Sequence, residues 1–83
     1  MDKVLVEVSL PATDRKFEVY IPLDLKFYDI TFLTSKVLSE LSNGLFISTE
    51  DSILCDGNTG EVLDVNMSPR ELKIKNGDKL MLL

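Results

Sequence analysis

The sequence predicts an α+β fold in which one helix packs on one face of a four- to five-stranded mixed sheet. Three observations support this prediction. Apolar and polar residues alternate over residues 4–10 and 16–22, apolar residues recur at helical spacing between residues 24 and 41, and an apolar run ends the chain at residues 80–83. Alternation is typical of half-buried strands, and spacings of three and four are typical of helices. With 83 residues, 45% of them hydrophobic, the chain is expected to form one domain spanning residues 1–83.

The first 22 residues predict an antiparallel hairpin. Two sets of apolar side chains alternate with polar ones, and each set shares one face of its strand. The sets are Val4, Val6, Val8 and Leu10, then Phe17, Val19 and Ile21. The segment 11–14 turns the chain between them, and Pro22 ends the second strand or confines it to a sheet edge, because proline cannot donate a backbone hydrogen bond.

A helix is predicted from about Asp24 to Leu41, with Asp24 as the N-cap. Asn43 or Gly44 is expected to end it in the left-handed conformation. The predicted inward face consists of Ile30, Leu33, Val37, Leu38 and Leu41.

The second half of the chain predicts short elements. Residues 53–55 and 61–64 are expected to pair as a small hairpin around the turn 56–60, and Ser68 with Glu71 forms a capping-box pattern that aims Leu72 and Ile74 inward. The last strand is too apolar for a sheet edge, so we expect it beside the first strand and parallel to it, with the helix in the connection. This arrangement is the β-grasp fold.

The charge and composition exclude several classes of function. There are 14 acidic and 9 basic residues, giving a net charge of −5, and the basic residues are scattered. Such a field repels phosphate backbones and anionic lipid, so no nucleic-acid partner is expected. No signal-peptide pattern or bilayer-length apolar run occurs. A cytoplasmic protein without direct membrane insertion is therefore predicted.

The residues suited to catalysis or metal binding are few. The chain has one cysteine, Cys55, and no histidine, so no catalytic residues, metal ligands or cofactor site can be assembled and no enzymatic activity is predicted. Cys55 is interpreted as a half-buried structural thiol rather than a nucleophile. The segment 56–61 is interpreted as a hairpin turn, because Glu61 stands where a calcium loop needs glycine. Glu50 and Asp51 are interpreted as loop and cap residues.

A candidate partner surface lies on the predicted helix. At about 100° per residue, Tyr28 and Phe32 point away from Ile30 and Val37, and Ser35 and Ser39 continue the same stripe. Exposed aromatic side chains beside small residues are typical of a protein-binding surface. Two alternatives stay open: the segment 45–47 covers both rings, or the helix begins near Asp29 and Tyr28 packs as a staple residue.

The whole chain resembles ubiquitin, and more specifically the YukD/EsaB family of bacterial ubiquitin-like proteins. The alternation over residues 4–10, the sequence Val19-Tyr20-Ile21-Pro22 and the closing stretch from Lys75 to Leu83 carry this resemblance. It implies a non-catalytic interaction module that is an accessory or regulatory component of a type VII (WXG100, ESX-like) secretion system. The implied partners are proteins of that machinery, such as its membrane ATPase, and the implied location is the cytoplasm, peripheral to the secretion complex. A homodimer is compatible with this interpretation.

Two other functions remain as alternatives. The chain could be the excised N-terminal ubiquitin-like domain of a larger membrane secretion protein. Ubiquitin and the sulfur carriers end in a flexible tail with a terminal Gly-Gly, whereas this sequence ends at Leu83. We therefore expect no conjugation, and a longer native chain would restore the covalent modifier or sulfur carrier as an alternative.

Overall fold

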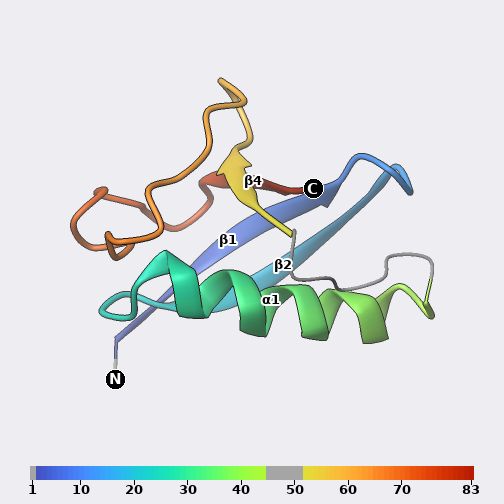
Figure 1. Cartoon of the computed structure of the whole chain (residues 1–83), viewed down its shortest axis with the longest axis horizontal. Helices are drawn as coiled ribbons and strands as arrows, with labels where there is room; N and C mark the ends of the chain where they lie inside the picture. The colour runs from blue at the N-terminus through green and yellow to red at the C-terminus, as the bar shows by residue number, and fades with distance from the viewer. Residues whose placement is uncertain (1, 45–51) are drawn as a thin grey trace.

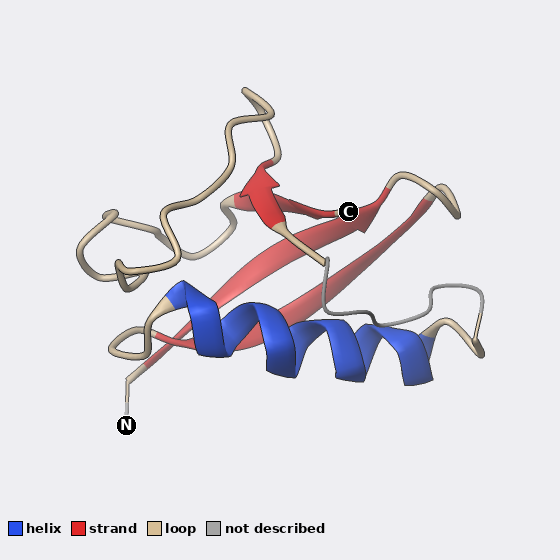
Figure 2. Ribbon diagram, viewed as in Figure 1, coloured by secondary structure: helices blue, strands red, loops and turns tan. Residues whose placement is uncertain are grey.

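The computed structural model describes residues 2–44 and 52–83, which form four strands and one helix (Figure 1). In chain order these are β1 (Lys3–Leu10), β2 (Arg15–Pro22), α1 (Phe27–Leu41), β3 (Leu54–Asp56) and β4 (Lys79–Leu82). The helix crosses one face of the sheet, and the long connection between β3 and β4 extends toward the N-terminal end of α1 (Figures 1 and 2).

The strands form one mixed sheet in the order β2-β1-β4-β3. β1 and β2 are antiparallel, β4 is antiparallel to β3, and β1 is parallel to β4, with Val8 opposite Leu80. The predicted central, parallel position of the last strand is therefore confirmed, and β2 lies at an edge and ends at Pro22. This topology confirms the predicted β-grasp fold.

The hydrophobic core lies between the sheet and α1. Inward side chains alternate along β1 and β4 as the period-two pattern predicts, and residues of the β3–β4 connection close one end. The buried cluster consists of Val4, Val6, Val8, Leu10, Ile21, Phe27, Ile30, Leu38, Leu54, Leu80 and Leu82. Leu72 and Ile74 pack against this cluster while partly buried, as predicted.

The helix begins at Phe27, so the prediction of an N-cap at Asp24 is wrong. Lys26 occupies the cap position without a side-chain hydrogen bond. The first backbone N–H groups of α1 are satisfied by distant carbonyls instead: that of Phe27 donates to Met67 O (2.9 Å) and that of Tyr28 to Val65 O (3.0 Å). These contacts replace the local cap that a helix start normally needs.

Asp24 has a different role, in a polar contact that joins three parts of the chain. The guanidinium group of Arg70 donates from Nε to Asp24 Oδ1 (2.7 Å) and from Nη2 to Asp24 Oδ2 (3.2 Å) and Asp2 Oδ2 (3.1 Å). The hydrogen bonds from Arg70 lower the pKa of the Asp24 carboxyl group below its ordinary value. This contact draws the carboxylate toward the 68–71 turn and away from the helix start.

The capping box at Ser68 and Glu71 is confirmed. The Ser68 N–H donates to Glu71 Oε1 (3.1 Å), and the Glu71 N–H donates to Ser68 Oγ (3.2 Å). A single helical turn follows, in which the Leu72 N–H donates to Ser68 O (3.1 Å). At the C-terminus of α1, Asn43 and Gly44 both adopt positive φ angles, as the predicted stop requires.

The segment 61–64 is not a strand, contrary to the prediction. It is joined to β3 by the isolated bridge between Cys55 and Val62 and by a hydrogen bond from the Leu63 N–H to Leu54 O (3.0 Å). The chain then leaves β3, and the Val65 carbonyl group accepts a hydrogen bond from the Tyr28 N–H at the helix start. The turn before it is confirmed, since Asp56 Oδ1 accepts hydrogen bonds from the backbone N–H groups of Asn58 and Thr59.

Candidate functional site

An apolar groove lies between α1 and the segment 52–65. Tyr28 and Phe32 project from the helix wall and are 71% and 57% exposed. The groove has a volume of about 740 Å³. Its lining residues are Tyr28, Asp29, Thr31, Phe32, Ser35, Ser52, Ile53, Leu54, Val62, Leu63 and Val65. The two candidate aromatic residues therefore form one wall of a larger apolar feature.

The opposite wall was missed by sequence reasoning. Ile53, Val62 and Val65 are exposed although they are apolar, and they line the groove across from the two rings. The hydrogen bond from the Tyr28 N–H to Val65 O fixes this segment against the helix start. The sequence signal was the presence of apolar residues on both sides of the turn 56–60, but their position opposite Tyr28 depends on tertiary contacts.

The serine positions of the predicted surface need correction. Ser35 is only 1% exposed, and its Oγ donates to Phe32 O (3.0 Å), so it packs under the groove rather than extending an outer stripe. Ser39 is half-buried, and its carbonyl oxygen accepts from Ser42 Oγ (3.2 Å) and from the Gly44 N–H (3.1 Å). The prediction of an outer stripe is therefore wrong at Ser35.

The buried face of α1 in the structure differs from the inward face that the sequence predicted. Leu33, Val37 and Leu41 were predicted to be buried, but each is about half exposed, at 50%, 47% and 50%. The buried residues of the helix are Phe27, Ile30, Thr34, Ser35 and Leu38. Apolar residues occur on both flanks of α1, so their mean direction does not identify the side that the sheet covers. Leu33 and Val37 instead line a smaller hollow of about 150 Å³ beside β2.

The charges around the groove are mostly negative. Asp29 lines it, and the segment 52–65 contributes Asp56, Glu61 and Asp64 without any lysine or arginine. Two bases lie on the helix side: Lys26 at the N-cap position of α1, and Lys36, whose Nζ is 4.4 Å from the centre of the Phe32 ring. The groove is therefore apolar, and acidic residues occur on both segments that form its walls. Asp29, Glu61 and Asp64 are called its acidic margin below.

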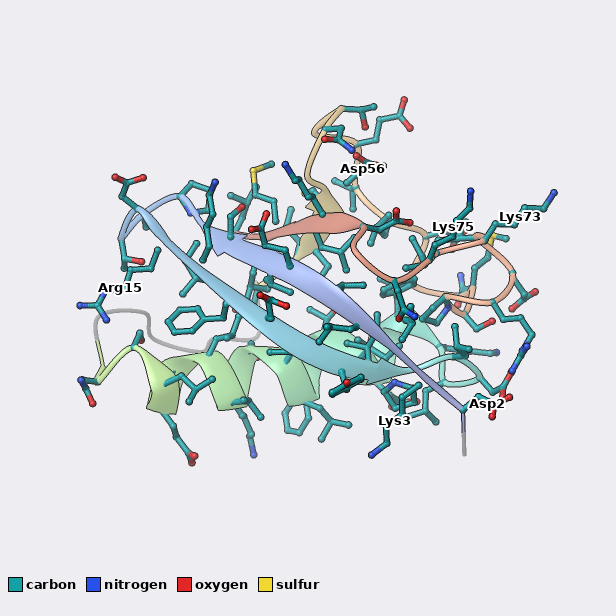
Figure 3. All side chains as sticks on the ribbon, turned by 180° about the vertical axis from the view of Figure 1, so that it is seen from behind. Asp2, Lys3, Arg15, Asp56, Lys73 and Lys75 are labelled. Carbon is teal, nitrogen blue, oxygen red and sulfur yellow. The ribbon has the colours of Figure 1, made fainter. Side chains whose placement is uncertain are left out.

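The basic side chains labelled in Figure 3 lie in three separate places. In Figure 3, Arg15 lies at one end of the molecule, Lys3 near the start of β1, and Lys73 with Lys75 on the β3–β4 connection. A phosphate backbone needs several such charges along one surface. The arrangement therefore offers no recognisable nucleic-acid interface among the labelled residues.

The thiol of Cys55 is buried rather than half-buried as predicted. Burial raises the pKa of this thiol, which disfavours the reactive thiolate. No group of three or more His, Cys, Asp or Glu residues that could hold a metal ion occurs within residues 2–44 and 52–83. The predictions for Glu50, Asp51 and the segment 45–47 concern residues outside this described part.

The mixed sheet with one helix packed on it defines a ubiquitin-like β-grasp fold, and solved structures agree with this class. The ubiquitin-like domain of EccD5 from Mycobacterium xenopi matches with a TM-score of 0.83 and 19% identity, covering 100% of this chain and 94% of that one. The ubiquitin-like domain of the Mycobacterium tuberculosis type VII secretion system protein EccD1 matches at 0.81 and 16%, covering 100% and 99%.

A third match lies in the MycP5-free ESX-5 inner membrane complex, with a TM-score of 0.82 and 19% identity. It covers 100% of this chain but 21% of that longer chain. Neither the models of known protein families nor the sequences of curated proteins match this chain. Across the part of the chain that the structure describes, no helix has the length and apolarity needed to cross a bilayer.

Proposed function

We propose that this chain is a non-enzymatic docking module of a type VII secretion system, an accessory or regulatory component that binds a protein of that machinery. The observation that carries the proposal is the full-length similarity to the ubiquitin-like domains of EccD5 and EccD1. It agrees with the resemblance of the sequence to the YukD/EsaB family. At 19% and 16% identity this likeness concerns the fold.

The site supports docking better than catalysis. Most of its lining residues are aromatic or aliphatic, and their side chains contribute binding energy by leaving water. The thiol of Cys55 is buried and carries a raised pKa, so it does not supply a nucleophile to the groove. The apolar groove and the buried thiol therefore favour an interaction module over an enzyme. We place this module in the cytoplasm, peripheral to a membrane secretion complex.

A deletion of the gene in its source bacterium tests the proposal. Secretion of WXG100 substrates into the medium should fall strongly, and a plasmid copy of the gene should restore it. Growth and general export by other routes serve as the controls. Unchanged secretion of these substrates in the deletion strain would contradict the proposed role.

The partner is tested by a pull-down with an N-terminal tag, from membranes dissolved in mild detergent. Enrichment of the secretion ATPase or another type VII component is the expected result, measured by mass spectrometry against the tag alone. Reproducible capture of the chain without any such component would refute a direct contact with the machinery.

A second candidate function is favoured by the match in the ESX-5 complex. The similar fold there forms 21% of a longer chain, so this chain could correspond to the ubiquitin-like domain of a larger membrane protein. An immunoblot of the source bacterium distinguishes the candidates. A band at the mass of the 83-residue chain favours the separate module, a longer band in the membrane fraction favours the fused domain, and a ladder of adducts favours a covalent modifier.

A further inference from the structure

We infer that the groove between α1 and the segment 52–65 binds a positively charged, amphipathic peptide segment of the partner protein. The inference deepens the proposed function, since it assumes that the chain docks onto another protein and specifies the chemistry of the contact. It rests on three features of the groove: its apolar walls, its acidic margin and its fixed shape.

The apolar walls provide the affinity. Tyr28 and Phe32 face Val62 and Val65 across the groove, and all four side chains are exposed. Removing such surface from water is favourable, and exposed aromatic residues are prominent in protein-binding sites. A volume of about 740 Å³ accommodates several apolar side chains of a peptide lying along the groove.

The acidic margin provides the selectivity. Asp29 lies on the helix side, and Glu61 and Asp64 lie on the opposite segment, where both are exposed. Lys36 already rests over the face of Phe32, so the cations of a partner would approach the acidic side. Complementary charges at the margin of an interface steer binding and disfavour partners of the wrong sign.

The walls are held in place by hydrogen bonds within the chain. The N–H groups of Phe27 and Tyr28 bind the carbonyl oxygens of Met67 and Val65, and the Leu63 N–H binds Leu54 O. These bonds join both walls to the helix and the sheet. A preformed groove loses little conformational entropy when a partner binds.

Charge also favours a basic peptide over other possible occupants of the groove. A second copy of the chain would bring a net charge of −5 and the same acidic margin toward the groove, so like charges would meet. Anionic lipid and nucleic acid are disfavoured for the same reason. A basic amphipathic segment is the occupant that satisfies both the walls and the margin.

The test is a titration of the purified 83-residue chain with two synthetic helical peptides, followed through backbone amide shifts in NMR spectra. One peptide carries leucine on one face and lysine on the other, and the second has glutamate at every lysine position. We expect the lysine peptide to shift amides around Tyr28, Phe32, Val62 and Val65. The glutamate peptide should bind at least about tenfold more weakly, and added salt should reduce this difference.

Matched variants locate the contact. Tyr28→Ser/Phe32→Ser should weaken binding of the lysine peptide at least about tenfold while leaving the unfolding midpoint nearly unchanged, because both rings are largely exposed. Leu33→Ser/Val37→Ser removes apolar area of similar exposure from the other flank of α1 and should leave peptide binding unchanged.

A second pair of variants tests the charge. Glu61→Gln/Asp64→Asn removes two charges from the margin and should weaken binding of the lysine peptide about threefold or more. Glu18→Gln, on the exposed face of β2, is the control and should have little effect.

Several outcomes would overturn the inference. These are equal affinity for the two peptides, shifts that centre on Leu33 and Val37, and no binding at millimolar peptide. Shifts of the groove amides that appear on concentrating the chain alone would assign the groove to a second copy. Unfolding of Tyr28→Ser/Phe32→Ser would place both rings in the core.

The result is independent of the secretion test. If the peptide binds as expected but deletion of the gene leaves secretion intact, the proposed function fails and the groove chemistry stands. If deletion abolishes secretion but the Tyr28→Ser/Phe32→Ser gene restores it fully, the function stands and the groove inference fails.

Discussion

Leu82 provides the most direct test of the fold, because its burial follows from the central position of β4 in the sheet. This residue is 1% exposed and lies opposite Leu54 in the pairing of β3 with β4. Leu82→Ala removes three carbon atoms from the core, a transfer loss of about 2.4 kcal/mol at about 0.8 kcal/mol each. The cavity left behind raises the expected loss of unfolding free energy to about 2 to 5 kcal/mol.

Such a loss is large for a chain of this size. At about 0.05 to 0.15 kcal/mol per residue, the total unfolding free energy of the domain is about 4 to 12 kcal/mol. Urea denaturation followed by circular dichroism measures the effect. A loss of about 3 kcal/mol lowers the urea midpoint by about 3 M if the slope is about 1 kcal/mol per molar urea.

Leu83→Ala is the matched control, since it makes the same chemical change one residue further on. Leu83 is 51% exposed, although its backbone N–H and carbonyl groups are both bonded to Ile53. We expect it to cost less than half as much as Leu82→Ala. A loss below about 0.5 kcal/mol for Leu82→Ala, or equal losses for both variants, would refute the central position of β4.

Three further changes test local features. Hydrogen bonds from Arg70 lower the pKa of the Asp24 carboxyl group below its ordinary value of 3.8. The ionised group therefore adds stability at pH values above 3.8, and this stability is lost as the pH falls through the lowered pKa of the folded state. Asp24→Asn should lower the melting temperature more at about pH 7 than at about pH 2; a constant difference would exclude the linkage. Gly57→Ala should destabilise the chain, because its Cβ would lie 2.8 Å from the backbone of Lys79; an unchanged urea midpoint would contradict that contact. Ser68→Ala should cost about 1 kcal/mol in urea denaturation through loss of the capping box, and no loss would show that the box adds nothing.

The elements that sequence reasoning placed correctly are those specified by local patterns. The hairpin of β1 and β2 follows from alternation, the stop at Asn43 and Gly44 from backbone preference, and the turn at Ser68 from a short capping motif. In each case the signal and the structure lie within a few residues of each other. The central position of β4 also followed, because an unbroken apolar strand is disfavoured at an edge.

The errors share one cause, which is contact between distant segments. Asp24 has the sequence features of an N-cap, but Arg70, far along the chain, binds its carboxylate. The helix start is satisfied by Met67 O and Val65 O, which no local pattern reveals. Residues 61–64 have the composition of a strand, but the chain leaves β3 to make those bonds.

In the candidate site, too, some features follow from the local sequence pattern and others from contacts between distant segments. The sequence by itself determined that Tyr28 and Phe32 lie on the same side of a helix, because helical periodicity fixes the relative directions of side chains. It left open whether that side is exposed, and the structure shows that both rings are. Only the tertiary structure decided that Ser35 is buried and that Val62 and Val65 form the facing wall. Periodicity fixes how side chains are spaced around a helix, whereas the side that the sheet covers depends on packing between segments far apart in the chain.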